Sequence, residues 1–399
     1  MTRHLYRLGI DLGRFKPEER RAWRLHGVGL RGALDDVFGA DGLHPEALSV
    51  SEPGRSDLYV AGLEPVASSR LRELFARLVD QIPHTFALEI ERDEQVIKRM
   101  LRARPQVLAR ALERALRRGV LEPSSILATL AGRAAELSSE GSPAEVLDGA
   151  SFEGLAGELT LAWRRQRRLG GRPAVLAAHG AGDGSPANAA VESLAEEVGR
   201  RLLLDHVGTA FHKGTPAFQH VPARAIVLPL LTSRGFFYGR LLRSLGDGPV
   251  LLPPLGEDPR LGDLVEAELI SRLDSTPHND VAVVVVGHGT RRHRDSGLTT
   301  GSLAERLRRR LPGAIVTRAF LDQEPNLGTV ATRVAALRRT VVTVPFLLGY
   351  ASHAKDDVDR ALRASGAERR IDLPPLLDLP GLTDLLVAVL GGSDLRRAA

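Results

Sequence analysis

Residues 281–289 read VAVVVVGHG, six apolar residues in a row followed by the motif Gly-His-Gly. A second stretch of this kind, AVLAAHG, occupies residues 174–180. Each leads through a glycine-containing loop into a helical pattern, at residues 302–311 and 189–204 respectively. Uninterrupted apolar strands that alternate with amphipathic helices are typical of parallel sheets covered by helices on both faces. The sequence therefore predicts an α/β fold for the C-terminal part of the chain.

The two stretches begin two copies of one repeat. His179 and His288 lie 109 residues apart, and an Ala-Phe pair and a proline downstream recur at the same spacing. Further anchors follow in the same order, with offsets that grow slightly. Such ordered self-similarity predicts two tandem domains. We expect repeat 1 at residues 171–275 and repeat 2 at residues 276–399, facing each other across a cleft.

Residues 1–170 follow a different pattern. We predict an α+β region of unknown function at residues 1–95, with short strand candidates only at 58–60 and 86–90. A helical region is predicted at 96–170, and its apolar spacing favours one continuous helix over 96–118. The whole N-terminal part is therefore expected to be mostly helical, and no motif in it points to a chemistry.

The composition excludes several classes of function. The 399 residues contain no cysteine, so disulfides, thiolate zinc sites and cysteine-ligated iron–sulfur clusters are excluded. The formal net charge is +5, but 49 acidic residues are interleaved with the 54 basic ones, which favours a solvated surface over a nucleic-acid footprint. Residues 180–184 read GAGDG, which matches no nucleotide-binding pattern. No apolar run is long enough to span a bilayer, and no signal segment opens the chain, so we expect a cytoplasmic protein without a membrane partner.

Candidate ligands occur where the predicted strands of repeat 2 end. His288 follows the first strand, His353 follows the strand at 341–348, and Asp322 and Glu324 follow a strand between them. The carboxyl ends of parallel strands meet at one edge of a sheet, so these side chains should converge. Imidazoles and carboxylates together bind divalent metals, and a free imidazole accepts protons near neutral pH.

These segments resemble the sirohydrochlorin cobaltochelatase and ferrochelatase family, the CbiX-like class II chelatases. The resemblance spans residues 172–390 and rests on the strand with Gly-His-Gly, on Ala-Phe-Leu-Asp-x-x-Pro at 319–325, and on Val-Pro-Phe-Leu-Leu at 344–348 with His-Ala-Lys-Asp-Asp at 353–357. It implies a lyase-type enzyme that inserts cobalt or iron into sirohydrochlorin or a related tetrapyrrole without ATP. The pathway would be that of cobalamin or siroheme.

The resemblance also implies roles for individual residues. His288, His353 and Glu324 would form the catalytic and metal-binding set, with Asp322 as a weaker candidate. The divalent metal, Co²⁺ or Fe²⁺, would be a substrate, and neither an iron–sulfur cluster nor a nucleotide is expected. Insertion removes two pyrrole protons, which imidazole and carboxylate groups are suited to accept or to balance in charge.

Repeat 1 departs from this pattern. Thr215 and Lys213 occupy the positions of Glu324 and Asp322, and Phe237 occupies that of His353. We therefore expect repeat 1 to have lost metal handling and to hold the macrocycle through aromatic faces, while arginines of repeat 2 bind its carboxylates. The expected substrate-binding residues are His179, Phe236, Phe237, Tyr238, Arg291 and Arg292.

Plainer interpretations remain for the same residues. His179 is also explained as a loop histidine bonded to backbone, and Glu324 as a turn carboxylate. The alternative function is a non-catalytic tetrapyrrole- or metal-binding protein on a chelatase fold. A third, a nucleic-acid-binding protein, rests only on the isoelectric point of about 9.9. Two repeats in one chain mean that no oligomer is required to form the cleft.

Overall fold

The computed structural model of the chain describes residues 4–25, 29–41, 45–53, 55–62, 65–79, 88–122, 125–140, 149–169, 172–204, 206–290, 297–349 and 354–392. They fall into two compact units, which are described separately. The N-terminal unit comprises Met1–Gly171 with Arg200–Asp205, and the C-terminal unit comprises Arg172–Gly199 with His206–Ala399.

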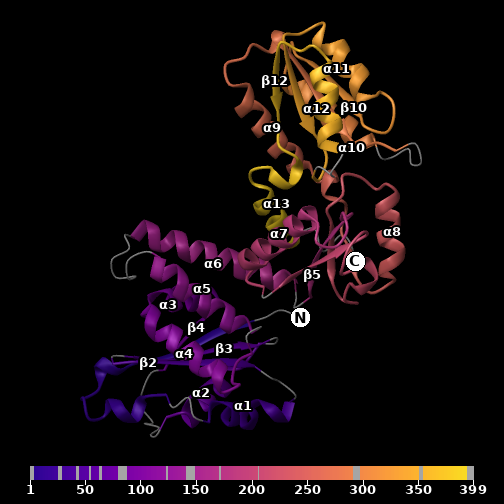
Figure 1. The fold of residues 1–399 in the computed structure, drawn as a ribbon. Coiled ribbons are helices and arrows are strands. Elements are labelled where there is room, and N and C mark those ends of the chain that lie inside the picture. The colour runs from indigo at the N-terminus through magenta and orange to yellow at the C-terminus, as the bar shows by residue number, and fades with distance from the viewer. Residues whose placement is uncertain are drawn as a thin grey trace. The chain divides into compact units, whose positions relative to one another are not determined.

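The N-terminal unit is built on an antiparallel sheet of four strands in the order β2-β3-β1-β4 (Figure 1). Alternate side chains enter two separate cores: Tyr6 and Leu8 pack with α1 and α2, and Leu5 packs with the later helices. The strands are β1 (His4–Asp11), β2 (Glu46–Glu52), β3 (Arg55–Gly62) and β4 (Glu89–Arg92). The helices are α1 (Leu30–Phe38), α2 (Ser68–Arg77), α3 (Glu94–Arg102), α4 (Pro105–Arg117), α5 (Ile126–Glu140) and α6 (Gly149–Leu169).

The prediction of few strands in residues 1–95 was wrong. Strand β1 escaped it because a charged residue, Arg7, and a glycine interrupt the apolar pattern of HLYRLGID. Arg7 is nevertheless fully buried, and its Nε donates to Asp57 Oδ1 at 2.9 Å while Nη1 lies 3.0 Å from Glu91 Oε2. Carboxylates on the two strands that flank β1 therefore let an arginine occupy a core position.

The continuous helix predicted over 96–118 was also wrong, because the chain forms two helices there. Helix α3 ends at Arg102 and α4 begins at Pro105. Proline has no amide hydrogen to bond the preceding turn, and it disfavours helical backbone in the residue before it. Arg104 accordingly has an extended conformation, and the proline takes the first position of α4.

The C-terminal unit contains two parallel sheets with the same strand order, β6-β5-β7-β8 and β10-β9-β11-β12 (Figure 1). This confirms the predicted α/β fold with two tandem domains. The strands are β5 (Ala174–Ala178), β6 (Val207–Phe211), β7 (Ile226–Pro229), β8 (Val250–Leu251), β9 (Val281–Gly287), β10 (Ile315–Phe320), β11 (Thr340–Pro345) and β12 (Arg369–Asp372). The helices are α7 (Pro186–Leu202), α8 (Phe236–Leu245), α9 (Pro259–Leu273), α10 (Leu298–Arg310), α11 (Leu327–Ala335), α12 (Ala354–Ala364) and α13 (Leu382–Leu390).

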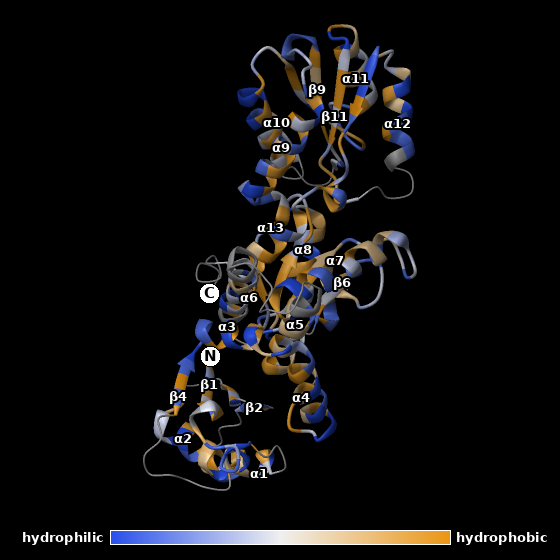
Figure 2. Ribbon diagram, turned by 90° about the vertical axis from the view of Figure 1, so that its left-hand side faces the viewer, coloured by the Kyte–Doolittle hydropathy of each residue, from blue (hydrophilic) through white to orange (hydrophobic). Residues whose placement is uncertain are grey.

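Strand β9 lies in the middle of its sheet, and all seven of its residues are buried. Ala282, Val284 and Val286 pack against residues of α11 and α12, and α10 also packs against β9. Figure 2 shows β9 and β11 as hydrophobic and the surrounding helices as mixed. Burial on both faces explains why this strand has no polar alternation.

The last helix of repeat 1 packs against the first helix of repeat 2. Arg306 on α10 forms ion pairs with Glu266 at 3.3 Å and with Asp263, and its Nη1 donates to the Pro259 carbonyl at 3.0 Å. All three acceptors belong to α9. This arginine therefore joins the two repeats through their helices.

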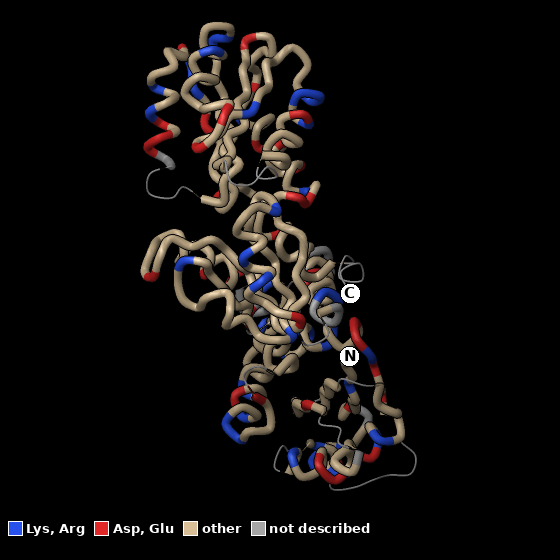
Figure 3. Tube along the Cα trace, turned by 90° about the vertical axis from the view of Figure 1, so that its right-hand side faces the viewer, with Lys and Arg blue, Asp and Glu red and all other residues tan. Residues whose placement is uncertain are grey.

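Charged residues are distributed along both units without large separation of sign, as Figure 3 shows for one side of the molecule. None of the described helices combines the length and the apolar character needed to cross a membrane.

Candidate functional site

The histidine of repeat 2 stands at the carboxyl end of β9. Gly287 of β9 pairs in register with Phe320 of β10, so the residues that follow these two strands are neighbours. The Asp322 amide donates to the His288 carbonyl at 3.0 Å, which extends the sheet contact beyond the strands. The side chains also meet: His288 Nδ1 lies 3.4 Å from Asp322 Oδ2. Both side chains are well exposed, at 66% and 63%, and so are accessible to a ligand.

The glycine after the histidine makes this approach possible. Gly289 has φ +73°, and a Cβ atom on it would lie 2.6 Å from Gln323 Cγ. Gln323 Oε1 accepts a hydrogen bond from the Thr290 amide at 3.0 Å, which fixes the loop against the turn. A side chain at position 289 would therefore separate the two loops that carry His288 and Asp322.

Glu324 is exposed and lies in the same turn. Its Oε2 accepts from the Asn326 amide at 2.9 Å, so this carboxylate stabilises the turn before α11. Its Oε1 makes no hydrogen bond among the described residues, so one oxygen is available to a ligand. The turn role and the predicted ligand role are therefore compatible.

His353, Arg291 and Arg292 lie outside the described residues. Among the described residues, no group of three or more His, Asp or Glu side chains is arranged to hold a metal ion. The set of His288, His353 and Glu324 remains a prediction.

Repeat 1 builds the same backbone frame with different side chains. The His212 amide donates to the Ala178 carbonyl at 3.1 Å, and the Lys213 amide donates to the His179 carbonyl at 2.8 Å. Gly180, like its counterpart in repeat 2, has a positive φ of +72°, and a Cβ atom on it would clash with the Lys213 carbonyl of the neighbouring turn. The lysine therefore occupies the backbone position that Asp322 has in repeat 2.

An aromatic cluster surrounds the histidine of repeat 1. The Phe237 ring, in the first turn of α8, meets the His179 ring edge-on with centroids 4.2 Å apart. Phe236 lies 5.3 Å from Phe237 and is 42% exposed. The guanidinium carbon of Arg234 lies over the Tyr238 ring, 5.7 Å from the ring centroid. The structure thus brings together three of the predicted residues, His179, Phe236 and Phe237.

Sequence reasoning missed His212, which is absent from the predicted site residues. Its ring lies 5.6 Å from that of His179 and 5.2 Å from that of Phe237. The available signal was its position directly after β6, at the carboxyl end of a parallel strand.

Both histidines of repeat 1 favour the neutral form. Burial lowers the pKa of His179 most, and the charges of Lys213, His212 and His288 lower it further, against a backbone hydrogen bond at Gly180 that raises it. Burial, with the charges of Arg240 and Lys213, also lowers the pKa of His212. These imidazoles therefore keep a lone pair at pH values where an ordinary histidine begins to protonate.

Sequence reasoning also missed a carboxylate in repeat 1. Asp183, in the glycine-rich loop after β5, accepts from the Thr215 amide at 2.6 Å and from its hydroxyl at 3.3 Å. In repeat 2 the turn is stabilised by its own Glu324 instead. Repeat 1 therefore supports the equivalent turn with a carboxylate from another loop.

The comparison with protein families finds a match within the second repeat. Residues 282–388 match the family model CbiX. No curated protein sequence matches the chain.

Three solved structures are similar to this chain, each over 57% of its length. CbiX, described as the terminal enzyme for biosynthesis of siroheme in denitrifying bacteria, is 25% identical, with 100% of that chain covered and a TM-score of 0.47. DR2241 from Deinococcus radiodurans, described as similar to chelatases but with two additional domains, is 23% identical, with 57% covered and a TM-score of 0.46. SirB from Bacillus subtilis with Fe³⁺ is 15% identical, with 98% covered and a TM-score of 0.46.

Proposed function

We propose, from the match of residues 282–388 to the CbiX family model, that this chain is a CbiX-like chelatase that inserts a divalent metal ion into a tetrapyrrole. The favoured substrates are Co²⁺ or Fe²⁺ and sirohydrochlorin or a related macrocycle, without ATP. The observation that carries the proposal is the His288–Asp322 pair at the carboxyl ends of β9 and β10, inside the matched residues.

The pair has the chemistry that metal insertion needs. A carboxylate beside Nδ1 holds the imidazole ring in one orientation and leaves Nε2 for the metal ion or a pyrrole proton. His353 is assigned to the second imidazole and Glu324 to the carboxylate that balances the charge of the incoming ion. The macrocycle must lose two protons, and these groups are suited to accept them.

Repeat 1 is assigned to binding the macrocycle. Phe236 and Phe237 offer aromatic surface to a flat conjugated ring, and the neutral His179 beside them adds no positive charge. Arg291 and Arg292 are assigned to the carboxylates of the substrate, which a guanidinium binds with two hydrogen bonds.

The test is an absorbance assay of the purified protein with sirohydrochlorin and Co²⁺, and separately with Fe²⁺, against the spontaneous rate. We expect His288→Ala and His353→Ala to lower the rate by about 10²-fold or more, and Asp322→Asn to lower it less. His278→Ala is the matched control, because His278 precedes β9 at its opposite, amino end. A wild-type rate equal to the spontaneous one, or full activity in both histidine variants, contradicts the proposal.

The second candidate is a carrier that binds a tetrapyrrole without inserting metal. It is favoured by repeat 1, where Lys213 and Phe237 occupy the positions of Asp322 and His353, the residues that we assign to the metal ion in repeat 2. A carrier gives a saturable spectral change with no turnover, and Phe237→Ala weakens that binding. The same absorbance measurement therefore separates the two functions.

A further inference from the structure

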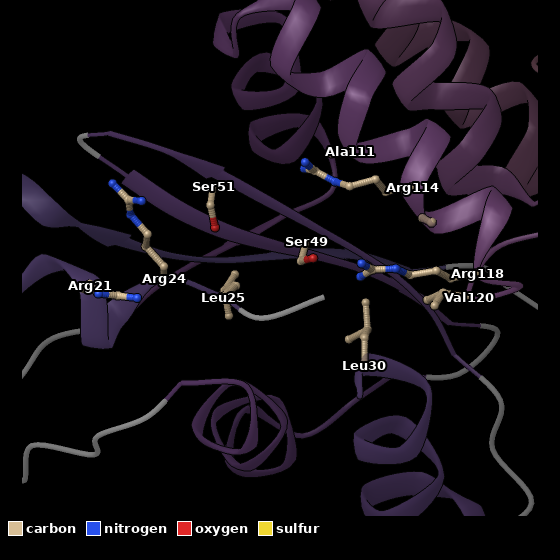
Figure 4. Close-up of a pocket in the computed structure, with 11 residues that line it drawn as sticks. Arg21, Arg24, Leu25, Leu30, Ser49, Ser51, Ala111, Arg114, Arg118 and Val120 are labelled. Carbon is tan, nitrogen blue, oxygen red and sulfur yellow. The ribbon is translucent and has the colours of Figure 1, made fainter. Parts of the chain in front are cut away.

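The N-terminal unit contains a pocket of about 420 Å³ that no part of the proposed function uses. It opens beside strand β2, at the edge of the sheet, between the 3-10 helix Arg20–Trp23 and helix α4 (Figure 4). Its polar lining consists of Arg21, Arg24, Arg114, Arg118, Ser49 and Ser51.

Regular elements hold these side chains on opposite sides of the pocket. Arg21 lies in the 3-10 helix and Arg24 follows it, and the buried Trp23 between them anchors this segment in the core. Arg114 lies in the last turn of α4 and Arg118 caps its end. In Figure 4 the two serines of β2 lie between the two pairs of arginines.

The serines face the pocket because of strand alternation. Leu48 and Val50 of β2 are buried in the core beneath α3–α6, so the residues between and after them point to the other face. Ser49 makes no hydrogen bond among the described residues, and Ser51 Oγ lies 3.4 Å from Ser56 Oγ. Hydroxyl donors are therefore available beside the guanidinium groups.

The four arginines have no acidic partner among the residues that the structure describes. None of them forms an ion pair with a described residue, and no Asp or Glu lines the pocket. By contrast Arg117, in the same helix, pairs with Glu113, and Arg77 pairs with Asp36 at 3.0 Å. Arg114 and Arg118 gain from the dipole at the end of α4, but that effect does not reach Arg21 and Arg24.

Four like charges around one cavity repel one another. A bound anion attracts each guanidinium group and so offsets this repulsion. The remaining lining is apolar, formed by leucine, alanine and valine side chains that include Leu25, Leu30 and Ala111. The volume is in the range of small-molecule sites. The ligand should therefore combine an apolar body with anionic groups at its rim.

We infer that this pocket binds a small organic anion that carries two or more carboxylate or phosphate groups on an apolar body. Guanidinium groups bind either kind of group with two parallel hydrogen bonds, and the serine hydroxyls donate to the remaining oxygens. The inference is independent of metal insertion, because it concerns only residues of the N-terminal unit.

The test is isothermal titration calorimetry of the full chain with two probes, benzene-1,3,5-tricarboxylate and inorganic pyrophosphate. We expect saturable binding of at least one probe, weaker in 0.5 M salt, and the tighter probe identifies the anionic group. Arg114→Gln with Arg118→Gln should weaken it at least tenfold. Arg72→Gln, an exposed arginine of α2 that removes one charge away from the pocket, should leave it unchanged.

Arg24→Gln provides a second variant on the opposite side of the pocket and should weaken binding independently of α4. Thermal unfolding of each variant shows that the fold is retained. Failure of both probes to bind at millimolar concentration contradicts the inference. Equal weakening by Arg72→Gln and by the pocket variants also contradicts it, because binding would then depend on net charge alone.

Discussion

His179 and His288 occupy the same position in the two repeats but have different neighbours. His288 is exposed beside a carboxylate, whereas His179 is packed against Phe237 and close to Lys213. One imidazole is thus oriented for ligand contact by an acid, and the other is kept neutral by burial. The difference arises from two side chains on an otherwise shared backbone frame.

His179 should titrate below the ordinary histidine value of 6.5. Because its folded pKa is lowered, the unfolded chain binds the proton first, so this residue makes stability fall as the pH drops below about 6.5. Phe237→Ala should raise the pKa of His179 by exposing it, and Lys213→Met should raise it by removing a repulsive charge. Lys213→Arg keeps the charge and should leave it unchanged. Histidine ring signals in an NMR pH titration measure all three, and an unshifted pKa in Phe237→Ala contradicts the role of burial.

Gly289→Ala should disturb the site through the backbone. The positive φ and the contact with Gln323 predict a loss of about 1–3 kcal/mol in the free energy of unfolding, measured by urea denaturation. Gly239→Ala in α8 is the control, because that glycine has ordinary helical geometry and a Cβ atom on it would meet only the flexible Arg243 side chain, at 3.5 Å. We expect it to be neutral or slightly stabilising. Equal losses in both variants would show that the fit at Gly289 is not special.

At the scale of elements, predictability followed the clarity of the pattern. Strands β5 and β9 were predictable because they are apolar throughout, as strands buried on both faces must be. Strand β1 was not, because Arg7 in its core position is compensated by carboxylates far along the chain. The position of His288 was predictable from strand ends alone. The role of Asp183 was not, because its bond to Thr215 joins two loops that have no common motif.

The packing of α10 against α9 is stabilised by Arg306, which contacts three groups of α9. Arg306→Gln should lower the free energy of unfolding of the C-terminal unit by about 1 kcal/mol, since the ion pairs are partly exposed. Arg309→Gln is the control: Arg309 is on the same helix, is 70% exposed, and among the described residues pairs only with Glu305. Circular dichroism during urea unfolding measures both. Losses of the same size would mean that the contact between repeats adds nothing beyond a surface ion pair.

At the scale of the whole molecule, the two units can be followed separately. The chain has only two tryptophans, Trp23 and Trp163, and both are buried in the N-terminal unit. Tryptophan fluorescence therefore reports the unfolding of that unit, whereas circular dichroism reports both. The Arg306 variant should leave the fluorescence transition in place.

Arg7→Met should destabilise the N-terminal unit. Burial lowers the pKa of Arg7, but Asp57 and Glu91 outweigh it, so the guanidinium stays charged and neutralises them. Its removal takes one of two arginine partners from Asp57, which keeps Arg55, and from Glu91, which keeps Arg99. The loss should stay below the about 3–5 kcal/mol of a buried charge left without any partner, and Asp57→Leu in the same chain should restore part of it. Tryptophan fluorescence in urea measures both. A loss below about 1 kcal/mol contradicts the importance of this network.

Arg7→Met should also change how the free energy of unfolding depends on pH. Burial raises the pKa of Asp57 to about 7, above its unfolded value of 3.8, so this group lowers stability as the pH rises between these values. Without Arg7 the pKa rises further, and the loss extends to higher pH. Arg7→Met should therefore be less destabilising at pH 5 than at pH 8. A larger loss at pH 5 than at pH 8 would contradict the role given to Asp57.

Strand β9 has a consequence outside the native state. Its run of six uncharged residues with a strong preference for extended structure is shielded only while α10, α11 and α12 cover it. Once the C-terminal unit opens, identical segments of different molecules can stack into intermolecular sheets, and no proline or charge within the run interrupts them. Heat should therefore drive this protein into aggregates from which it does not refold. Its half-life at a given temperature will then be governed by the unfolding rate of the C-terminal unit.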